Sequence, residues 1–265
     1  MERISEKFKL LQENGITAFI PFSVAGFPDP EKSLEIFLKL AEGDVLEFGF
    51  PFSDPVADGP VIQAASTEAI RNGITMDKAL DMIREIRRRS DVPIIFFSYF
   101  NPIHSYGPER FVSRAKACGV DGVLVVDLPL NEARWLKPLT DKANLAWIYL
   151  ATPTTPDFRI QKMDQDGSGF LYYVSVTGVT GTRGSLPSGL SQKCEHVRQI
   201  CRLPVAVGFG ISSPQQASLL RPHVDGVVVG SEIISRVQRG DSVADIGEWV
   251  KEMKAALSQS GSGSV

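Results

Sequence analysis

The feature that most constrains the fold of this chain is a series of eight short apolar runs, separated by charged stretches with helical periodicity. The runs, none of which contains Lys or Arg, are expected to be strands: Thr17–Phe22, Val45–Gly49, Pro93–Tyr99, Gly122–Asp127, Ala146–Leu150, Phe170–Val176, Pro204–Gly208 and Gly226–Gly230. Alternating strands and helices are joined by right-handed crossovers into a parallel sheet, and continuous apolar strands are typical of a sheet covered on both faces. Eight such units favour closure, so the sequence predicts an α/β fold, a (β/α)8 TIM barrel in a single domain.

The charged stretches between these runs are expected to be amphipathic helices. Examples are Pro30–Ala41, Met76–Arg89, Pro108–Cys118, Asn131–Ala143 and Leu190–Cys201. A last helix is predicted over Ile233–Leu257, with a break near Gly240, and an extra helix over Glu2–Asn14 is expected to close the N-terminal end of the barrel. The barrel domain therefore covers residues 1–257, and the Ser/Gly-rich residues 258–265 are expected to form a flexible tail.

The composition argues against several classes of partner. The 265 residues, 43% of them hydrophobic, can bury a sizeable core, and a net charge of −3 gives no reason to expect nucleic acid or an anionic membrane as a partner. No apolar run approaches the ~18 residues that cross a bilayer, and the charged N-terminus lacks a signal-peptide pattern. Three cysteines without metal-ligand spacing predict a reduced, cytoplasmic protein. A chloroplast protein whose transit peptide has been removed would carry the same signals.

An acidic residue, Glu47, lies inside the second apolar run. A buried carboxylate is more often half of a structural salt bridge, but none of the eight runs supplies a cation within the barrel wall. Burial without a cation should raise the pKa of Glu47 and allow proton exchange near neutral pH. Asp58 follows in the next loop, at the carboxyl-terminal end of the barrel, where enzymes with a (β/α)8 barrel have their active sites. Asp58 and Gly59 are also typical of an ordinary turn, but two carboxylates at one opening predict divided acid and base roles.

Three glycine-containing segments follow the sixth, seventh and eighth runs: Gly178–Gly181, Gly208–Ser213 and Gly230–Ser231. Barrels often bind phosphate in the loops after their last strands, where glycine amides and a helix N-terminus face the anion. Turns and close packing explain most single glycines. Three glycine-containing segments that each follow one of three successive strands instead predict a phosphate site made of neutral amides. Ser231 is expected to cap its helix and to donate its hydroxyl to the phosphate. The segment Thr182–Ser188 is expected to be either a mobile lid over the site or a solvated loop.

The segment Leu46–Pro60 (LEFGFPFSDPVADGP) closely resembles the signature of the tryptophan synthase alpha family. The resemblance covers nearly the whole chain, and the other matching segments are Pro21–Phe22, Tyr99–Pro102, Asp127–Pro129, Gly178–Gly181, Gly208–Pro214 and Gly230–Ser231. It implies a carbon–carbon lyase that cleaves indole-3-glycerol phosphate to indole and glyceraldehyde 3-phosphate in a retro-aldol manner.

The resemblance also implies a role for each matching residue. Glu47 is the expected acid/base, Asp58 the group that stabilises the indole N–H as it becomes acidic, and Tyr172 the family's active-site tyrosine. The implied wall of the indole pocket consists of Phe22, Phe97, Leu124, Thr180 and Phe209. The implied phosphate contacts are Gly181, Gly210, Gly230 and Ser231.

A partner follows from the same resemblance. The family works with a beta subunit that uses pyridoxal phosphate to join indole to serine, and the expected assembly is an α2β2 heterotetramer. Contact with the partner is expected to activate the alpha site, and indole passes between the subunits. The expected interface residues are Pro51, Asp54, Pro55, Asn101 and Pro129, and Asp127 is expected to support this rim or to contact the partner. The alpha chain itself is expected to need neither a metal nor a cofactor.

Some positions depart from the family pattern. Phe27 stands where the family usually has an aspartate, which removes a carboxylate expected at the rim and is expected to alter contact with the partner. Phe97 is bulkier than the expected leucine and should tighten the indole pocket. The segment Ala41–Asp44 is shorter than usual. None of these changes touches the predicted acid/base pair.

Three other functions remain open at this stage. A free-standing indole-3-glycerol phosphate lyase would share the site but release indole without a partner. A phosphate-binding sugar isomerase on the same barrel would lack the Leu46–Pro60 signature. A regulatory protein that only switches a beta subunit would not need both Glu47 and Asp58. The three scattered histidines (His104, His196 and His223) give no support to a metal site or a nucleophilic triad.

Overall fold

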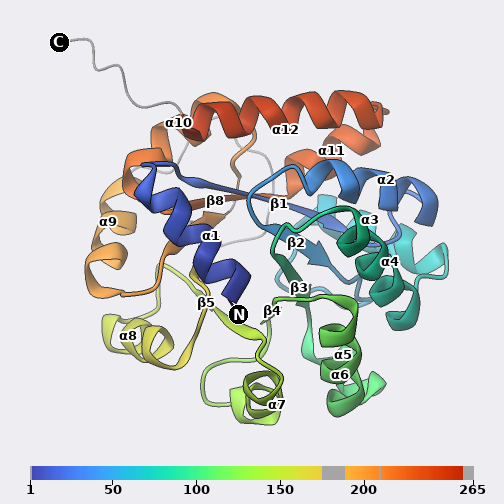
Figure 1. Cartoon of the computed structure of the whole chain (residues 1–265), viewed down its shortest axis with the longest axis horizontal. Coiled ribbons are helices and arrows are strands. Elements are labelled where there is room, and N and C mark those ends of the chain that lie inside the picture. Colours follow the sequence, from blue (N-terminus) through green and yellow to red (C-terminus); the bar gives the residue numbers. More distant parts are fainter. Residues whose placement is uncertain (1, 175–188, 209, 259–265) are drawn as a thin grey trace.

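A computed structural model of the chain describes residues 2–174, 189–208 and 210–258. Eight parallel strands follow one another in sequence order and form a closed barrel in which β8 pairs with β1 (Figure 1). The strands are β1 (Ala18–Val24), β2 (Leu46–Gly49), β3 (Ile94–Ser98), β4 (Gly122–Val125), β5 (Ala146–Ala151), β6 (Leu171–Val174), β7 (Val205–Gly208) and β8 (Gly226–Val229). The predicted (β/α)8 barrel is therefore confirmed, and each of the eight apolar runs overlaps one strand.

Helices surround this barrel (Figure 1). Among the described residues they are α1 (Glu2–Glu13), α2 (Pro30–Leu40), α3 (Pro60–Arg71), α4 (Met76–Arg89), α5 (Phe100–Tyr106), α6 (Pro108–Cys118), α7 (Lys137–Lys142), α8 (Asp157–Asp166), α9 (Leu190–Ile200), α10 (Pro214–Leu220), α11 (Ser231–Gln238) and α12 (Val243–Ser258), with 3-10 turns η1 (Ala133–Trp135) and η2 (Arg221–His223). The predicted break near Gly240 is confirmed. The single helix predicted over Asn131–Ala143 is wrong, because the chain forms η1 and then α7. Pro138 has no N–H with which to continue a helix, and it lies in the first turn of α7 instead.

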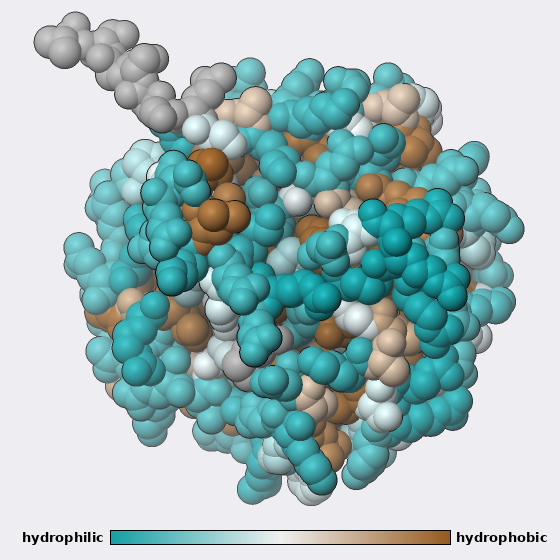
Figure 2. Space-filling model, viewed as in Figure 1, coloured by the Kyte–Doolittle hydropathy of each residue, from teal (hydrophilic) through white to brown (hydrophobic). Residues whose placement is uncertain are grey.

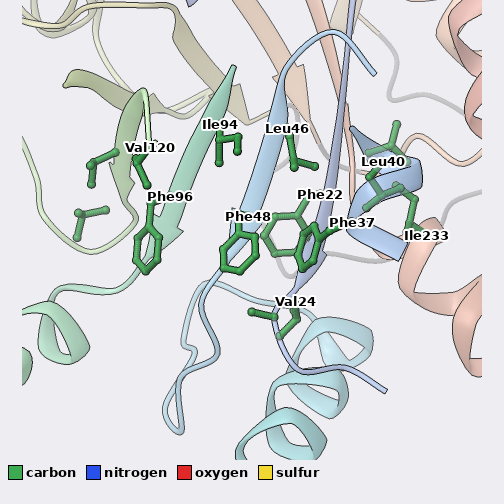
Figure 3. Packing of buried hydrophobic residues seen from close by; sticks show 14 of the residues in the cluster. Phe22, Val24, Phe37, Leu40, Leu46, Phe48, Ile94, Phe96, Val120 and Ile233 are labelled. Atoms are coloured by element: carbon green, nitrogen blue, oxygen red, sulfur yellow. The ribbon is translucent and has the colours of Figure 1, made fainter. Parts of the chain in front are cut away.

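Side chains of the strands alternate between two apolar clusters. In β3, Ile95 belongs to the cluster inside the barrel, whereas Ile94 and Phe96 belong to the cluster between the strands and the helices. Phe37 of α2 stacks on Phe48 of β2 with ring centroids 4.4 Å apart, which fastens the helix to the outer face of the sheet (Figure 3). Burial on both faces is the reason why the strands read as continuous apolar runs.

Helix α1 lies across the N-terminal end of the barrel, as predicted (Figure 1). Its Ile4, Phe8 and Leu11 are buried and belong to the inner cluster. The ring of Phe8 lies 5.4 Å from the ring of Phe170, the residue before β6. The amphipathic pattern of this helix therefore serves to close the barrel.

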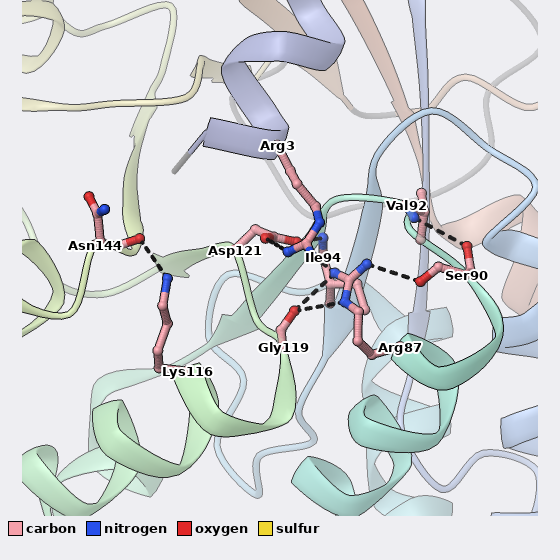
Figure 4. Close-up of polar contacts among 9 residues, drawn as sticks. All are labelled: Arg3, Arg87, Ser90, Val92, Ile94, Lys116, Gly119, Asp121 and Asn144. Carbon is pink, nitrogen blue, oxygen red and sulfur yellow. Dashed lines mark hydrogen bonds and ion pairs between the residues drawn. The ribbon is translucent and has the colours of Figure 1, made fainter.

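A buried carboxylate, Asp121, ties α1 to the wall of the barrel. Its Oδ1 is 2.8 Å from Arg3 Nη1, and its Oδ2 is 2.6 Å from Arg87 Nη2 (Figure 4). Asp121 Oδ2 also accepts a hydrogen bond from the backbone N–H of Ile94 at 2.9 Å. One carboxylate at the start of β4 thus joins α1, α4 and β3.

The face of the molecule crossed by α1 is mostly hydrophilic, with apolar side chains in separate patches (Figure 2). Within the part of the chain that the structure describes, no helix is long and apolar enough to cross a membrane. The predicted partner residues all follow the carboxyl ends of strands, so they belong to the opposite end of the barrel.

Candidate active site

The two carboxylates singled out in the sequence reach the carboxyl-terminal opening of the barrel from one βα unit. Glu47 is the second residue of β2, and Asp58 lies two residues before α3. The neighbours of Glu47 in β2, Leu46 and Phe48, belong to the outer cluster, so the side chain of Glu47 points into the barrel. In the sheet register Glu47 is opposite Phe22 of β1.

The carboxyl group of Glu47 is buried without a cation. The residue is 1% exposed, its Oε1 has no hydrogen-bond partner among the described residues, and none of the ion pairs among them involves it. Loss of hydration penalises the charged form and raises the pKa of Glu47 to about 8. This agrees with the rise expected from the sequence, and it leaves the group mostly protonated at neutral pH.

Asp58 has a different environment. It is 6% exposed, and burial raises its pKa to about 6, while a hydrogen bond from Tyr99 lowers it. The Tyr99 hydroxyl donates to Asp58 Oδ2 at 3.1 Å. Asp58 is therefore mostly ionised at the pH at which Glu47 is mostly protonated, which is the division of roles that two carboxylates at one opening predict.

Tyr172 of β6 is the third of the expected catalytic residues. Its ring covers Gly208 of β7, where a Cβ would lie 2.1 Å from the tyrosine hydroxyl. Burial raises the pKa of Tyr172 well above its ordinary value, and the charges of Glu47 and Asp58 raise it further. Glu47 and Asp58 are thus each within electrostatic range of Tyr172, and Tyr172 stays a neutral hydroxyl.

Sequence reasoning missed the role of Tyr99. This residue follows β3 and is 2% exposed. It was expected as the last residue of a strand and as part of a segment that matches the family, but no site role was given to it. A polar aromatic at the carboxyl end of a barrel strand is nevertheless a recognisable signal for this site. Its contact with Asp58 joins residues 41 positions apart in the chain.

An apolar wall faces the carboxylates. The ring of Phe22 occupies space left by two glycines, because a Cβ on Gly49 or Gly230 would lie 2.6 or 2.7 Å from it. Phe97 contacts the ring of Phe22 edge to face, with centroids 5.1 Å apart. Leu124, paired with Phe97 in the register, is fully buried in the inner cluster. The structure therefore brings together Phe22, Phe97 and Leu124, the described members of the expected indole pocket.

The expected phosphate residues are described only in part. Gly210 has φ +76, a left-handed conformation that favours glycine. Ser231 is the first residue of α11 and is 9% exposed, but it does not cap the helix, as had been expected. The capping residue is Gly230, and no side chain makes a capping hydrogen bond. Thr180, Gly181, Phe209 and the segment Thr182–Ser188 lie outside the described residues.

Most of the expected partner residues are accessible. Asp54, Asn101 and Pro129 are exposed and Pro55 is partly exposed, whereas Pro51 is buried within the chain. Asp127 is exposed and accepts a hydrogen bond from the backbone N–H of Phe100.

Phe27 does not belong to this rim. It is 2% exposed and packs in the outer cluster, so its own side chain offers no surface to a partner. A phenylalanine there contributes to the core, because its side chain is apolar and fully enclosed.

Within residues 2–174, 189–208 and 210–258, no three His, Cys, Asp or Glu side chains form a group that could hold a metal ion. Two histidines instead make hydrogen-bond contacts with carboxylates near the surface: His196 with Asp157 at 2.9 Å and His223 with Glu195 at 2.7 Å.

Comparison with known proteins gives one consistent result. Residues 8–260 match the family model described as tryptophan synthase alpha chain. The tryptophan synthase alpha chain of Geotalea daltonii is 48% identical over 241 residues, which cover 90% of this chain and 91% of that protein. That of Citrifermentans bemidjiense is 44% identical over 262 residues, covering 97% and 98%. The crystal structure of tryptophan synthase subunit alpha from Legionella pneumophila has a TM-score of 0.88 and 35% identity, and covers 97% of this chain and 98% of that one.

Proposed function

The chain belongs to the tryptophan synthase alpha chain family, and from that membership together with the site we propose that it cleaves indole-3-glycerol phosphate to indole and glyceraldehyde 3-phosphate. The observation that carries the proposal is the buried, cation-free carboxyl group of Glu47 at the same barrel opening as Asp58, with both acids within electrostatic range of Tyr172. A retro-aldol cleavage needs a proton donor and a separate stabiliser of positive charge, and these two environments provide them.

The reaction begins with protonation of ring carbon 3 of the indole by Glu47. Protonation at carbon 3 places positive charge on the ring nitrogen and makes its N–H acidic. The Asp58 carboxylate accepts a hydrogen bond from that N–H and stabilises the charge. Ionised Asp58 suits this role because a neutral acid would lack the charge.

The second half of the reaction breaks the carbon–carbon bond. The Glu47 carboxylate formed in the first step takes the proton of the hydroxyl on the glycerol carbon attached to the ring. That carbon becomes the aldehyde of glyceraldehyde 3-phosphate, and the bond's electron pair returns to the ring to give indole. Tyr172, as a neutral hydroxyl beside Glu47 and Asp58, can donate a hydrogen bond to reacting oxygen atoms.

Substrate binding divides between an apolar wall and neutral amides. Phe22, Phe97 and Leu124 provide a slot for the indole ring. The loop at Gly210 and the N-terminus of α11 at Gly230 and Ser231 provide N–H groups for the phosphate, and we include Thr180, Gly181 and Phe209 in the site by family resemblance.

The proposal extends to a partner. We propose that the rim with Asp54, Pro55, Asn101 and Pro129 binds a tryptophan synthase beta subunit in an α2β2 heterotetramer and passes indole to it. In this arrangement the beta subunit holds pyridoxal phosphate, and the alpha chain needs no cofactor of its own. We also propose a cytoplasmic location, supported by three free cysteines, of which Cys118 and Cys194 are buried.

Release of indole from indole-3-glycerol phosphate by the purified chain, with and without a cognate beta subunit, tests this proposal. We expect slow release by the chain alone and strong acceleration by the partner. Fast release by the chain alone would indicate a free-standing lyase. No release in either condition from folded protein would exclude the reaction and leave either a regulatory function or a different phosphate substrate.

A further inference from the structure

The loop that carries Asp58 is joined to the end of β3 by a single hydroxyl group. The Tyr99 hydroxyl donates to Asp58 Oδ2 at 3.1 Å and accepts from the backbone N–H of Ala57 at 3.0 Å. Its ring is buried, with its centroid 5.1 Å from that of Phe52 in the same loop. One side chain therefore fixes both the carboxylate and the backbone immediately before it.

The backbone beside Tyr99 is held in place by a residue that follows β4, the next strand of the barrel. The backbone N–H of Phe100 donates to Asp127 Oδ1 at 2.7 Å, which ties the start of α5 to the end of β4. Asp127 lies two residues before Pro129, in the rim proposed to bind the partner. Hydrogen bonds thus connect this rim with Asp58 through the backbone between Tyr99 and Phe100.

A neutral donor suits this position better than a cation would. A lysine or arginine beside Asp58 would orient the carboxylate but would also cancel the charge that stabilises the indole N–H. A tyrosine hydroxyl occupies one carboxylate oxygen and leaves the net charge in place, so the other oxygen can accept from the substrate. Among the described residues, Asp127 after β4 acts electrostatically on Tyr99, and Asp58 acts on Tyr172 of β6, as does Glu47 of β2.

We propose that Tyr99 is a positioning residue: its hydroxyl holds the Asp58 carboxylate where it meets the indole N–H, and Asp127 fixes the backbone beside Tyr99. This inference rests on the proposed function, because it assigns the orientation of Asp58 to the cleavage step. It is distinct from a role in holding the fold, since the ring of Tyr99 can pack without its hydroxyl.

Tyr99→Phe keeps the ring and removes only the hydroxyl. We expect kcat for indole release to fall about 10- to 100-fold, as for loss of one hydrogen bond to a charged group, with a much smaller change in KM. The acidic limb of the kcat–pH profile should move to higher pH, because the hydrogen bond from Tyr99 lowers the pKa of Asp58. Asp127→Ala should show a weaker form of the same change, and Asp127→Asn should restore activity because its amide oxygen can still accept from Phe100.

Tyr149→Phe is the matched control. The Tyr149 hydroxyl donates to Asp166 Oδ2 at 2.5 Å, in the outer layer of the barrel, so this variant loses a similar tyrosine–aspartate contact. Its kcat and acidic limb should match those of the wild type. The proposal is overturned if Tyr99→Phe leaves the acidic limb of the kcat–pH profile unmoved and lowers kcat no more than Tyr149→Phe does.

A second measurement does not depend on the reaction. NMR titration of the ¹³C-labelled Asp58 carboxyl, without substrate, should show a higher pKa in Tyr99→Phe than in the wild type and no change in Tyr149→Phe. An unchanged titration overturns the positioning role even if the wild type releases no indole. Failure of the wild type to release indole, with the titration shifted as expected, would instead count against the proposed function alone.

Discussion

At the scale of single residues, Glu47 and Asp58 differ in what surrounds each carboxyl group. Glu47 has neither a cation nor a hydrogen bond to its Oε1 among the described residues, whereas Asp58 accepts a hydrogen bond from Tyr99. The same penalty of burial therefore raises the pKa of Glu47 further, to about 8, than that of Asp58, to about 6. The first residue is suited to give a proton and the second to carry a charge.

The two pKa values predict a bell-shaped dependence of kcat on pH. Activity needs ionised Asp58, which is lost as pH falls through about 6, and protonated Glu47, which is lost as pH rises through about 8. Initial rates of indole release at saturating substrate between pH 5 and 9.5 give this profile. An alkaline limb that stays absent up to pH 9.5 would contradict the assignment of Glu47 as the acid.

Phe97 is predicted to set the size of the indole pocket. Replacing it with leucine removes the edge-to-face contact with Phe22 and opens space beside the ring. We expect Phe97→Leu to improve KM for substrates with a substituent on the indole ring, relative to the unsubstituted substrate, by about 3- to 10-fold. Phe96→Leu, the neighbour that points into the outer cluster, should lower stability without changing this preference. Equal effects of the two variants would exclude Phe97 as the determinant.

Local sequence predicted two carboxyl groups at one barrel opening and the raised pKa of Glu47, but not the contacts around them. Glu47 was recognisable because a lone acid in an apolar strand conflicts with its surroundings. The contact of Tyr99 with Asp58 and the burial of Phe27 depend on how distant segments meet, which local sequence does not specify. The expected cap from Ser231 was wrong because the helix begins one residue earlier than expected, with Gly230 as the capping residue. The roles of all the site residues remain predictions, and Thr180, Gly181 and Phe209 also lie outside the described residues.

At the scale of helices and strands, the sequence predicts the barrel well, because each strand is buried on both faces and reads as one apolar run. Helices α4 and α6 begin and end at the predicted residues, since each combines a strong apolar stripe with clear boundaries. One continuous helix was predicted where the chain forms η1 and then the short α7. Pro138 lies in the first turn of α7, a position that proline favours, so a new helix begins there.

Helix α1 is predicted to contribute strongly to stability because it closes the barrel. Phe8→Ala removes a buried ring from the inner cluster and should lower the free energy of unfolding by about 3–5 kcal/mol. Leu10→Ala, on the exposed side of the same helix, should change it by less than about 0.5 kcal/mol. Urea denaturation of both variants makes the comparison, and equal small losses would show that α1 is not a structural part of the barrel.

At the scale of the whole molecule, the acid in the barrel makes stability depend on pH. The folded chain holds the Glu47 proton up to about pH 8, whereas the unfolded chain releases it near its ordinary pKa of 4.5. Protonation of Glu47 therefore contributes stability that is fully present below pH 4.5 and is lost, at about 1.4 kcal/mol per pH unit, as pH rises towards 8.

Glu47→Gln should remove this dependence, so its stability relative to the wild type should increase between pH 5 and 8. Chemical denaturation of both proteins across this range measures the difference. Glu85→Gln, at an exposed ion pair on α4, should show no such increase. A constant difference between wild type and Glu47→Gln would mean that Glu47 is ionised in the folded protein at all these pH values.

The measurement that tests the catalytic role of Glu47 most directly is indole release at pH 7 by the wild type, Glu47→Gln and Asp164→Asn at equal concentrations of folded protein. Asp164 is a buried carboxylate paired with Arg202 in the outer layer, so its variant controls for loss of a buried acid elsewhere. We predict that Glu47→Gln lowers kcat by about 10²- to 10⁴-fold, as for loss of a general acid/base, and that Asp164→Asn keeps wild-type kcat. Wild-type release of indole by Glu47→Gln would contradict the account.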